Sequence, residues 1–404
     1  MLPKKIVYVY QFFRTPEEGG IIRSYYLSRS LADADYEVEV ITSHNEKKYA
    51  CKQIEGLTVH YLPLHYEQRY GTLRRLYVYL AFVLKAIGCA LRIRNVYRCY
   101  IASVPLSVGF IGLAMKWFKG VPYYFEVGDL WPRTPIEMGY FKNRFLQKFL
   151  YGLEHLFYEQ AEKVIGLSPA IQSDIEERIN RPVAYISNIA DCEFYQPRSK
   201  DPALENRWNA AGKTVITYFG SIGKVVALDA LLDIARLGQN RTDLSFLIVG
   251  TGSELAHLKQ KAVGLDHVQF LGHVNKGQLR DILSITDVAY LSYLDVPALG
   301  TNSPNKLFEA LAAGKLCVIN IRGWHCDMIE SEGCGFYADQ KNPQQFYDKL
   351  KPYLQQPEFL HQASENARRL AETQFSRQKL GADFVALFNV EQPSLRRNHV
   401  LVNS

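Results

Sequence analysis

The sequence predicts two α/β domains of similar size, each a parallel sheet covered by helices on both faces. Strand-like apolar runs alternate with helical patterns along nearly the whole chain, which is typical of parallel sheets with helical connections. The chain has 404 residues, too many for one ordinary core. That length suits two domains of roughly 200 residues each. The alternation also stops and restarts around a polar stretch near the middle, so we place a domain boundary there.

A first domain is expected to span residues 1–190. Its strands are short apolar runs, and its helices carry apolar residues at intervals of three and four. The strands are expected at 6–10, 37–42, 58–62, 99–104, 123–127, 164–167 and 183–187, and the helices at 21–32, 73–92, 106–118, 142–159 and 169–178.

A linker is expected at 191–213, which is polar and carries Pro197 and Pro202. The second domain should cover 214–376, followed by a final helix at 377–391 and a frayed polar tail at 392–404. The strands of this half are expected at 215–219, 245–249, 268–271, 288–291 and 316–319, and its helices at 227–237, 254–263, 276–285, 305–313, 327–331, 344–354 and 360–373.

Composition indicates a soluble protein with a mildly basic balance. Apolar residues make up 48%, charged residues 22%, and the net charge is +6. Such a balance suits acidic small molecules or an anionic membrane surface, and it does not require nucleic acid.

The seven cysteines are an odd number without a Cys-x-x-Cys pair, which argues against a disulfide framework or a zinc ribbon. A metal site at His325, Cys326 and Cys334 would lack a fourth ligand at a usual spacing.

Two segments could be mistaken for membrane signals. Lys4-Lys5 precedes an apolar run, but the run is short and charged residues follow at once, so we predict a buried first strand. The longest apolar stretch, 77–93, contains Lys85 and Arg92 and is short for a spanning helix. We therefore expect a cytoplasmic, thiol-reduced protein.

Three glycine-rich turns follow predicted strands, where open α/β sheets bind ligands. The first is Gly19-Gly20, the second runs from Gly220 to Lys224, and the third holds Gly250 and Gly252. Glycine lets the backbone approach a ligand closely, but strand-to-helix turns also need it for structural reasons. The first turn has no G-x-G-x-x-G pattern and the chain has no Walker Gly-Lys-Ser/Thr, which disfavours dinucleotide oxidoreduction and P-loop hydrolysis.

The segment 303–309, Ser-Pro-Asn-Lys-Leu-Phe-Glu, reads as the start of a helix. Ser303 is a candidate N-cap, with Pro304 at the first helical position. Lys306 is unexpected there because cations are disfavoured at a helix N-terminus, and it makes sense if a polyanion binds the free amides. Glu309 lies on nearly the same face and suits ribose hydroxyls. An ordinary capped helix with an exposed Lys–Glu pair explains the same residues, so both interpretations stay open.

Taken in order along the chain, these motifs resemble a known family. The chain is similar to retaining family 4 glycosyltransferases of GT-B fold, in particular the bacterial branch that builds surface polysaccharides. The resemblance covers nearly the whole chain. It rests on Gly19-Gly20 with the Arg-Ser-Tyr-Tyr-Leu-Ser helix, Glu126-Val-Gly-Asp-Leu-Trp-Pro132, Leu167-Ser-Pro169, Phe219-Gly-Ser-Ile-Gly223, Val249-Gly-Thr-Gly252, Phe270-Leu-Gly-His-Val274 and Ser303-Pro-Asn-Lys306 with Glu309.

The resemblance implies two Rossmann-like domains facing across a cleft, with the final helix crossing back onto the first domain. It implies that Glu309 holds the ribose, that the backbone at His273 and Val274 meets the base, and that Asn305 to Leu307 meet the diphosphate. The donor-binding set is then Gly19, Gly20, Gly220, Lys224, Gly250, Gly252, His273, Val274, Ser303, Asn305, Lys306, Leu307 and Glu309.

The chain departs from the family pattern at three places. The family often has a glutamate shortly before the Glu309 position, where this chain has Thr301. Its common Arg and Lys after Gly220 are replaced by Ser221 and Val226, which leaves Lys224 and Lys306 to carry phosphate charge. Its usual histidine near Asp129 is missing, with Gly128 beside that residue. These departures bear on sugar recognition and on the catalytic contacts.

Glycosyl transfer from a nucleoside diphosphate requires stabilisation of the leaving diphosphate. We expect Lys306, Glu309 and Asp129 to be the catalytic residues, with Asp129 orienting the sugar or the acceptor hydroxyl. Turn capping explains Asp129 equally well. No metal or other cofactor is implied. The sequence Asp33-Ala34-Asp35 imitates a metal-binding Asp-x-Asp but is expected in a solvated turn.

Two basic segments with aromatic residues point to the acceptor side. No acidic residue lies between Arg69 and Arg98, where seven basic residues alternate with five aromatics. The segment Tyr140–Tyr151 places Phe141, Phe145 and Phe149 at helical spacing among basic residues. Such faces suit an anionic membrane interface and a pyrophosphate-linked lipid acceptor, although the aromatics could also be core and the basic residues a solvated face. No nucleic-acid recognition module is present.

Three functions remain open from the sequence. The first is a retaining glycosyltransferase that uses a nucleotide sugar, expected to be a UDP-sugar, at the inner face of the cell membrane. The second is a GT-B-fold nucleotide-sugar epimerase, which would need acid/base side chains but no acceptor. The third is an inert nucleotide-sugar-binding protein, motivated by the departures from the family pattern.

Overall fold

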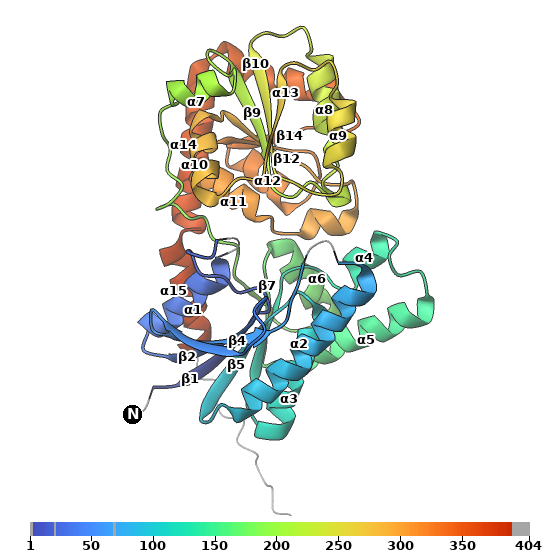
Figure 1. Ribbon diagram of the computed structural model, residues 1–404, viewed down its shortest axis with the longest axis vertical. Helices are drawn as coiled ribbons and strands as arrows, with labels where there is room; N and C mark the ends of the chain where they lie inside the picture. The colour runs from blue at the N-terminus through green and yellow to red at the C-terminus, as the bar shows by residue number, and fades with distance from the viewer. Residues whose placement is uncertain (1–2, 20–21, 68–69, 390–404) are drawn as a thin grey trace, which may run out of the picture.

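The computed structural model describes residues 3–19, 22–67 and 70–389. Two α/β domains are stacked along the long axis, with the N-terminal half at the bottom of Figure 1 and most of the C-terminal half at the top. Each domain contains one sheet covered by helices, so the predicted two-domain α/β fold is confirmed.

The N-terminal sheet has eight strands in the order β3-β4-β2-β1-β5-β6-β7-β8. All neighbours are parallel except β3 and β4, which form an antiparallel pair. The strands are β1 Lys5–Val9, β2 Glu37–His44, β3 Ala50–Ile54, β4 Leu57–Pro63, β5 Val96–Ala102, β6 Tyr123–Val127, β7 Lys163–Gly166 and β8 Ala184–Tyr185.

Helices cover both faces of this sheet and produce two cores. One core lies under α1 and α15, around Tyr8 and Tyr100, and the other lies under α2, α3, α5 and α6. The helices of this half are α1 Arg23–Asp33, α2 Thr72–Arg92, the 3₁₀ helix η1 Leu106–Val108, α3 Gly109–Lys119, α4 Arg133–Glu137, α5 Arg144–Gln160 and α6 Pro169–Ile179, and α15 is Arg377–Asn389 from the end of the chain.

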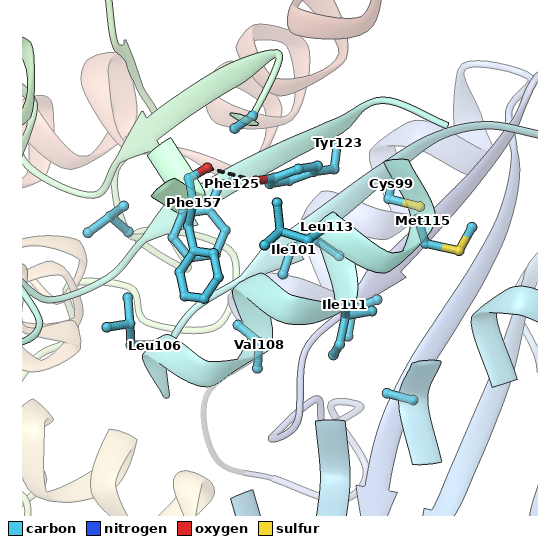
Figure 2. Packing of buried hydrophobic residues seen from close by; sticks show 14 of the residues in the cluster. Cys99, Ile101, Leu106, Val108, Ile111, Leu113, Met115, Tyr123, Phe125 and Phe157 are labelled. Carbon is cyan, nitrogen blue, oxygen red and sulfur yellow. Dashed lines mark hydrogen bonds between the residues drawn. The ribbon is translucent and has the colours of Figure 1, made fainter. Parts of the chain in front are cut away.

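Two glycines let α3 pack directly against aromatic rings (Figure 2). A Cβ at Gly109 would lie 2.4 Å from the Phe157 ring, and one at Gly112 would lie 2.6 Å from the Tyr123 ring. The Tyr123 hydroxyl donates to the Phe157 carbonyl oxygen at 2.7 Å, which holds both rings in place. A side chain at Gly109 would therefore push α3 away from α5, and one at Gly112 would push it away from the sheet.

The C-terminal sheet has six parallel strands in the order β11-β10-β9-β12-β13-β14. These are β9 Thr214–Phe219, β10 Leu244–Val249, β11 Val268–Gly272, β12 Val288–Leu291, β13 Leu316–Ile319 and β14 Gly335–Tyr337. The helical elements are α7 Pro202–Arg207, η2 Lys224–Val226, α8 Asp229–Leu237, α9 Leu255–Lys261, α10 Lys276–Ile285, η3 Pro297–Thr301, α11 Asn305–Ala312, α12 Trp324–Ser331, α13 Pro343–Gln355 and α14 Pro357–Gln374.

The chain passes between the domains twice, and the two passages lie side by side. Ala190 and Ser376 form a parallel β-bridge, and the Ala190 amide donates to the Phe375 carbonyl oxygen at 2.8 Å. After this bridge α15 crosses back and packs on α1, as expected for the final helix. On the other side of the cleft, η3 contacts α4 and α6, where the Ala298 amide donates to Glu137 at 2.8 Å and the Ser168 hydroxyl donates to the Thr301 carbonyl oxygen at 2.6 Å.

Several sequence expectations were wrong in detail. The edge strands β3 and β14 and the short helix α4 were missed, and the segment expected as a plain linker contains α7. Ser303 is not the N-cap of α11, because the helix begins at Asn305 and extended Pro304 occupies the cap position without a side-chain cap. Ser303 instead meets Asn188, whose side-chain amide donates to the Ser303 carbonyl oxygen at 2.5 Å. Within residues 3–19, 22–67 and 70–389, no helix is both long and apolar enough to cross a bilayer.

The packing of α3 predicts opposite effects for two glycine-to-alanine substitutions. Gly112→Ala should lower the free energy of unfolding by about 1–3 kcal/mol, because its methyl group overlaps the Tyr123 ring. Gly152→Ala, in the exposed part of α5, meets nothing within 4 Å and should stabilise the protein by about 0.5–1 kcal/mol through helix propensity. Thermal unfolding followed by calorimetry compares the two variants. A Gly112→Ala protein as stable as Gly152→Ala would contradict the packing described.

Candidate active site

A pocket of about 600 Å³ lies where the two domains and their connections meet. Its walls combine residues of the first domain, the interdomain segment and the second domain. They are Arg14, Glu18, Gly19, Ile22, Arg23, Tyr26, Ile189, Asp191, Tyr195, His273, Val274, Asn275, Lys276, Leu279, Asn305 and Glu309. The pocket therefore exists only when both domains are in place, as expected for a ligand held across a cleft.

Five of the residues selected from the sequence line this pocket. Gly19 comes from the first domain, and His273, Val274, Asn305 and Glu309 come from the second. Gly20 lies outside the described residues.

The segment at His273 and Val274 is fixed by the start of α10. Asn275 caps this helix: its side-chain oxygen accepts from the Gln278 amide at 2.9 Å, and the Gln278 side chain accepts from the Asn275 amide at 2.9 Å. This reciprocal pair holds the chain entering α10 in one conformation, which places the 273–275 backbone along the pocket wall.

Glu309 lies in the pocket beside the Tyr195 hydroxyl and the Lys276 ammonium. Burial raises the pKa of Glu309 to about 7, and the charges of Lys276 and Lys306 oppose that rise. The buried Tyr195 hydroxyl has no hydrogen-bond partner of good geometry among the described residues and faces this carboxyl group. Glu309 and Tyr195 together can therefore hold a polar ligand such as a vicinal diol.

Lys306 lies at the carboxyl end of β9, next to the glycine turn that follows it. Its ammonium donates to the Tyr218 hydroxyl at 3.0 Å, and that hydroxyl donates to the Ser221 carbonyl oxygen at 2.6 Å. The ammonium also lies 4.4 Å from the centre of the Tyr218 ring and 5.4 Å from that of Tyr293. No carboxylate among the described residues comes within 4 Å of it, so Lys306 has no salt bridge.

Burial lowers the pKa of Lys306 to about 7, and Glu309 opposes this shift. A desolvated ammonium of this kind is stabilised by any anion that binds beside it. The amides of Asn305 and Lys306 at the start of α11 point to the same end of the cleft as free donors. The Leu307 amide is engaged, because it donates to the Pro304 carbonyl oxygen at 3.1 Å, and the Leu307 side chain is buried.

The glycines of the second and third turns serve different purposes. Gly220 has φ of 134°, and a Cβ there would lie 3.1 Å from the Lys306 nitrogen, so a side chain would displace the lysine. Gly250 and Gly252 are required by the neighbouring turn, since a Cβ would lie 1.8 Å from the Gly220 oxygen and 2.0 Å from the Ile222 oxygen, respectively. Lys224 is exposed on η2 and does not line the pocket.

Asp129 follows β6 and is partly buried between the domains. Burial raises the pKa of its carboxyl group, and the charge of Asp129 acts on Tyr10 of the first domain and Tyr293 of the second. Its side chain makes no hydrogen bond to another described residue, so it does not cap the turn that contains it. Tyr293 also lies near Lys306, so Asp129 and Lys306 are both close to this ring.

Five charged residues at the pocket were not selected from the sequence, namely Arg14, Glu18, Arg23, Asp191 and Lys276. Arg23 is buried and pairs with Glu126 at 2.6 Å, while its other nitrogens donate to the Ser187 and Ile186 carbonyl oxygens at 2.9 Å each. The Tyr100 hydroxyl donates to the same Glu126 carboxylate. This network ties the start of α1, directly after the Gly19 turn, to the ends of β6 and β8.

Asp191 is the centre of a second network. Lys276 donates to it at 2.8 Å, and Arg377 at the start of α15 also donates to it. Burial alone would raise the pKa of Asp191, but these two cations lower it below its ordinary value. The guanidinium of Arg377 also stacks over the Tyr26 ring at 4.1 Å.

Arg14 carries a charge that has no acidic partner among the described residues. It lines the pocket from the first domain and donates only to the Phe13 carbonyl oxygen at 3.1 Å. Of the pocket cations, Arg23 and Lys276 have acidic partners, and Arg14 has no salt bridge among the described residues. Its position in the turn between β1 and Gly19 was the available signal in the sequence.

The candidate metal residues do not converge. His325 is buried and accepts from the Cys326 amide through Nδ1 at 2.9 Å. In the part of the chain that the structure describes, no group of three or more His, Cys, Asp or Glu side chains is arranged to hold a metal ion.

Both halves of the chain match glycosyltransferase models. Residues 18–188 match the "Glycosyl transferase 4-like domain", and residues 202–370 match "Glycosyl transferases group 1". The protein has both domains and the GT-B fold of a glycosyltransferase.

Solved structures with this fold extend over nearly all of the chain. Sucrose-phosphate synthase from Thermosynechococcus elongatus superimposes with a TM-score of 0.74 at 14% identity, covering 95% of this chain and 98% of that one. Anabaena Alr3699/HepE in complex with UDP and glucose superimposes with a TM-score of 0.70 at 17% identity, covering 96% and 100%. At these identities the likeness shows the fold.

A curated relative matches over a shorter region. The probable glycosyltransferase WbjE of Pseudomonas aeruginosa is 23% identical over 240 residues, which are 57% of this chain. The match covers 59% of that relative's own length.

The lowered pKa of Lys306 predicts proton uptake when a diphosphate binds. The free lysine loses its proton as pH rises through about 7, and the bound anion restores it, so affinity for UDP should fall by up to about tenfold per pH unit between about pH 7 and about pH 9. Calorimetric titration in buffers of different ionisation enthalpy measures the uptake.

Two variants separate the groups that titrate in this range. Lys306→Ala should remove most of the pH dependence, whereas Glu309→Gln should keep the part due to the lysine. Affinity independent of pH, with no proton taken up by the unchanged protein, would show that the lysine is not beside the diphosphate.

Proposed function

We propose that this chain transfers a sugar, with retention of configuration, from a UDP-sugar to a lipid-linked or growing surface-polysaccharide acceptor. The observation that carries the proposal is the arrangement at the cleft: Glu309 lies in a pocket shared by both domains, with the unpaired cations Lys306 and Arg14 near it. A nucleoside diphosphate sugar presents ribose hydroxyls and a diphosphate, which are the groups that these residues suit.

The proposed donor site has two parts. Glu309 and Tyr195 bind the ribose, with the backbone of His273 and Val274 against the base. Lys306, the amides of Asn305 and Lys306, and Gly19 bind the diphosphate. That HepE was solved with UDP and with glucose, on the same fold, supports a UDP-sugar for this chain.

The chemistry proposed for the site is electrostatic. Negative charge grows on the diphosphate as the glycosidic bond breaks, and cations already held in place stabilise that charge without reorganising. Lys306 is held by Tyr218 and Arg14 reaches the cleft from the opposite domain, so domain closure would bring both to the leaving group. Asp129, unbonded between Tyr10 and Tyr293, is proposed to orient the reacting sugar or the acceptor hydroxyl. We propose hexosyl or N-acetylhexosaminyl transfer without a metal ion.

Membrane contact at the inner face of the cell membrane is proposed for the N-terminal domain. On α2 the side chains of Leu73, Tyr77, Leu80 and Leu84 are 46–84% exposed and share one face of the helix. On α5 the side chains of Phe145 and Phe149 are 86% and 61% exposed, close in sequence to exposed Lys142, Arg144 and Lys148. An exposed apolar patch of this size with basic neighbours fits an anionic bilayer surface.

The two basic segments do not contribute uniformly to this surface. Phe82 is buried in the core, and Arg98 is buried in an ion pair with Glu162 at 2.7 Å, so neither belongs to it. Phe141 packs against Trp131. Arg69 lies outside the described residues.

The diphosphate role predicts unequal effects for two lysines that the sequence alone could not separate. Lys306→Ala should lower turnover about a hundredfold or more with little change in melting temperature, because it removes the held cation at the leaving group. Lys224→Ala, exposed and outside the pocket, should change turnover by less than about tenfold. Steady-state kinetics with a panel of UDP-sugars and acceptors measures both.

Product analysis separates the alternatives. Nuclear magnetic resonance of the product should show the anomeric configuration of the donor together with free UDP. Release of an isomerised nucleotide sugar without free UDP would favour an epimerase, and tight donor binding without turnover over the whole panel would favour an inert binding protein. Near-normal kinetics of Lys306→Ala would refute the assigned role.

The membrane contact predicts a loss of vesicle binding on removing exposed apolar side chains. The double variant Leu84→Ser/Phe145→Ser should bind anionic vesicles at least about tenfold more weakly, since each buried side chain contributes about 1–2 kcal/mol. Val263→Ser/Phe359→Ser removes comparably exposed side chains from the C-terminal domain and serves as the control. Co-sedimentation with vesicles measures the binding, and equal losses in the two double variants would contradict a contact through α2 and α5.

A further inference from the structure

A second pocket, of about 690 Å³, lies on the N-terminal domain, at the end of α2 that points away from the C-terminal domain. The residues that matter for its chemistry are Glu39, His60, Lys85, Gly88, Arg92 and Arg94. Glu39 stands early in β2, opposite Val7, whereas the cleft lies at the carboxyl ends of the strands. The pocket is therefore separate from the donor site.

The single carboxylate in this pocket is already neutralised. Glu39 pairs with Lys5 at 3.0 Å and with His60 at 2.5 Å. The pKa of His60 is raised mainly by its contact with the Cys89 sulfur and, second, by its contact with the Glu39 carboxylate. The negative charge of Glu39 is thus balanced by two cations from within the fold.

Three further cations in the pocket have no acidic partner among the described residues. The Lys85 ammonium donates to the Pro63 carbonyl oxygen at 2.9 Å, and Arg92 and Arg94 are exposed and make no ion pair there. A hollow with an excess of positive charge concentrates anions more strongly than a flat surface does. Two guanidinium groups and an ammonium group suit the oxygens of a phosphate group.

Gly88 keeps the hollow open. A Cβ at this position would meet nothing within 4 Å, so the missing side chain leaves empty space between Lys85 and Arg92 on the helix surface. Glycine in the middle of a helix destabilises it by roughly 0.5–1 kcal/mol relative to alanine. The helix therefore carries a costly residue at a position where a larger side chain would extend into the pocket.

The exposed apolar stripe of α2, defined as Leu73, Tyr77, Leu80 and Leu84, indicates where the phosphate comes from. At about 100° per residue, Arg74, Lys85 and Arg92 lie about 80–100° around the helix from Leu84. A helix lying in a bilayer interface along this stripe would bring the pocket to the depth of the lipid headgroups. A phosphate group attached to a lipid satisfies both features, whereas a free phosphate would leave the apolar stripe uncovered.

We propose that this pocket binds the phosphate headgroup of an anionic membrane phospholipid, at a site distinct from both donor and acceptor. The inference rests on the membrane contact under the proposed function and makes it specific. Headgroup binding at one end of α2, together with the apolar stripe, fixes the orientation of the N-terminal domain on the bilayer. The cleft then opens at a defined height above the surface.

The test compares Arg92 with Arg74, which share one face of α2, and includes Arg94, which follows the end of that helix. The full chain is titrated with vesicles of phosphatidylcholine containing phosphatidylglycerol, and binding is competed with glycerophosphoglycerol, the soluble deacylated headgroup. Arg92→Ala and Arg94→Ala should each weaken vesicle binding at least about tenfold and abolish competition. Arg74→Ala removes the same charge from the same face but outside the pocket, and should weaken binding by about fivefold or less, as expected for diffuse attraction.

A filling variant tests the pocket without changing charge. Gly88→Leu keeps every cation and adds apolar surface, so diffuse interfacial attraction predicts unchanged or stronger vesicle binding. A headgroup site predicts weaker binding and loss of competition, as in Arg92→Ala. If Gly88→Leu binds as well as the unchanged protein, and Arg92→Ala matches Arg74→Ala, the pocket is not a headgroup site.

Two further readouts keep this proposal separate from the transferase activity. Calorimetric affinity for UDP should be unchanged in Arg92→Ala and Gly88→Leu, because the pocket lies away from the cleft. If the unchanged protein ignores vesicles yet turns over a UDP-sugar, the headgroup proposal falls and the proposed activity stands. Turnover absent in every assay, with headgroup competition intact, would sink the activity and leave the pocket assignment in place.

Discussion

Asp191 holds the two domains together at the point where the chain crosses between them. It accepts from Lys276 of the second domain and from Arg377 of the returning helix, and the bridge between Ala190 and Ser376 aligns the two crossings. The candidate active site depends on this junction, since Arg14 and Gly19 come from one domain and Asn305 and Glu309 from the other. Because Lys276 also acts on the charge of Glu309, the junction and the proposed ribose site share one electrostatic environment.

Around this junction the site contains both charged residues with a partner of opposite charge and charged residues without one among the described residues. Arg23 and Glu126 are buried and fully engaged, which suits a structural role, because a buried ion pair that loses one partner is strongly destabilising. Lys306 and Arg14 have no acidic partner, and burial weakens the charged form of Lys306. A buried cation without an acidic partner is expensive for the unliganded protein, and an anionic ligand offsets that cost. The same contrast between matched and unmatched charge separates Glu39 from Arg92 and Arg94 in the pocket at the far end of α2.

The sequence predicted the parts of the structure that depend on local periodicity. The buried strands β6, β12 and β13 begin and end where their apolar runs begin and end. The helices α2 and α5 follow the helical spacing of their apolar residues. Edge strand β3 was missed because its side chains are largely exposed and lack an apolar run. Ser303 was misjudged as an N-cap because its neighbour Pro304 takes the cap position and Asn188 binds its carbonyl oxygen from the other domain.

The roles of Arg14, Arg23 and Asp191 depend on residues more than a hundred positions away, and no local pattern encodes those contacts. Gly250 and Gly252 were noted as ligand contacts, but the neighbouring turn already requires them.

We propose that a nucleoside diphosphate sugar binds between the domains with its diphosphate at Lys306 and its ribose at Glu309. A crystal structure of the protein soaked with UDP-, GDP- and ADP-sugars in turn would test it most directly. Electron density for one of these nucleotides should lie in the cleft, with a diphosphate oxygen within hydrogen-bonding distance of the Lys306 nitrogen and the ribose hydroxyls on the Glu309 carboxylate. Density for the nucleotide elsewhere on the molecule, or an empty cleft at saturating concentrations of all three, would contradict it.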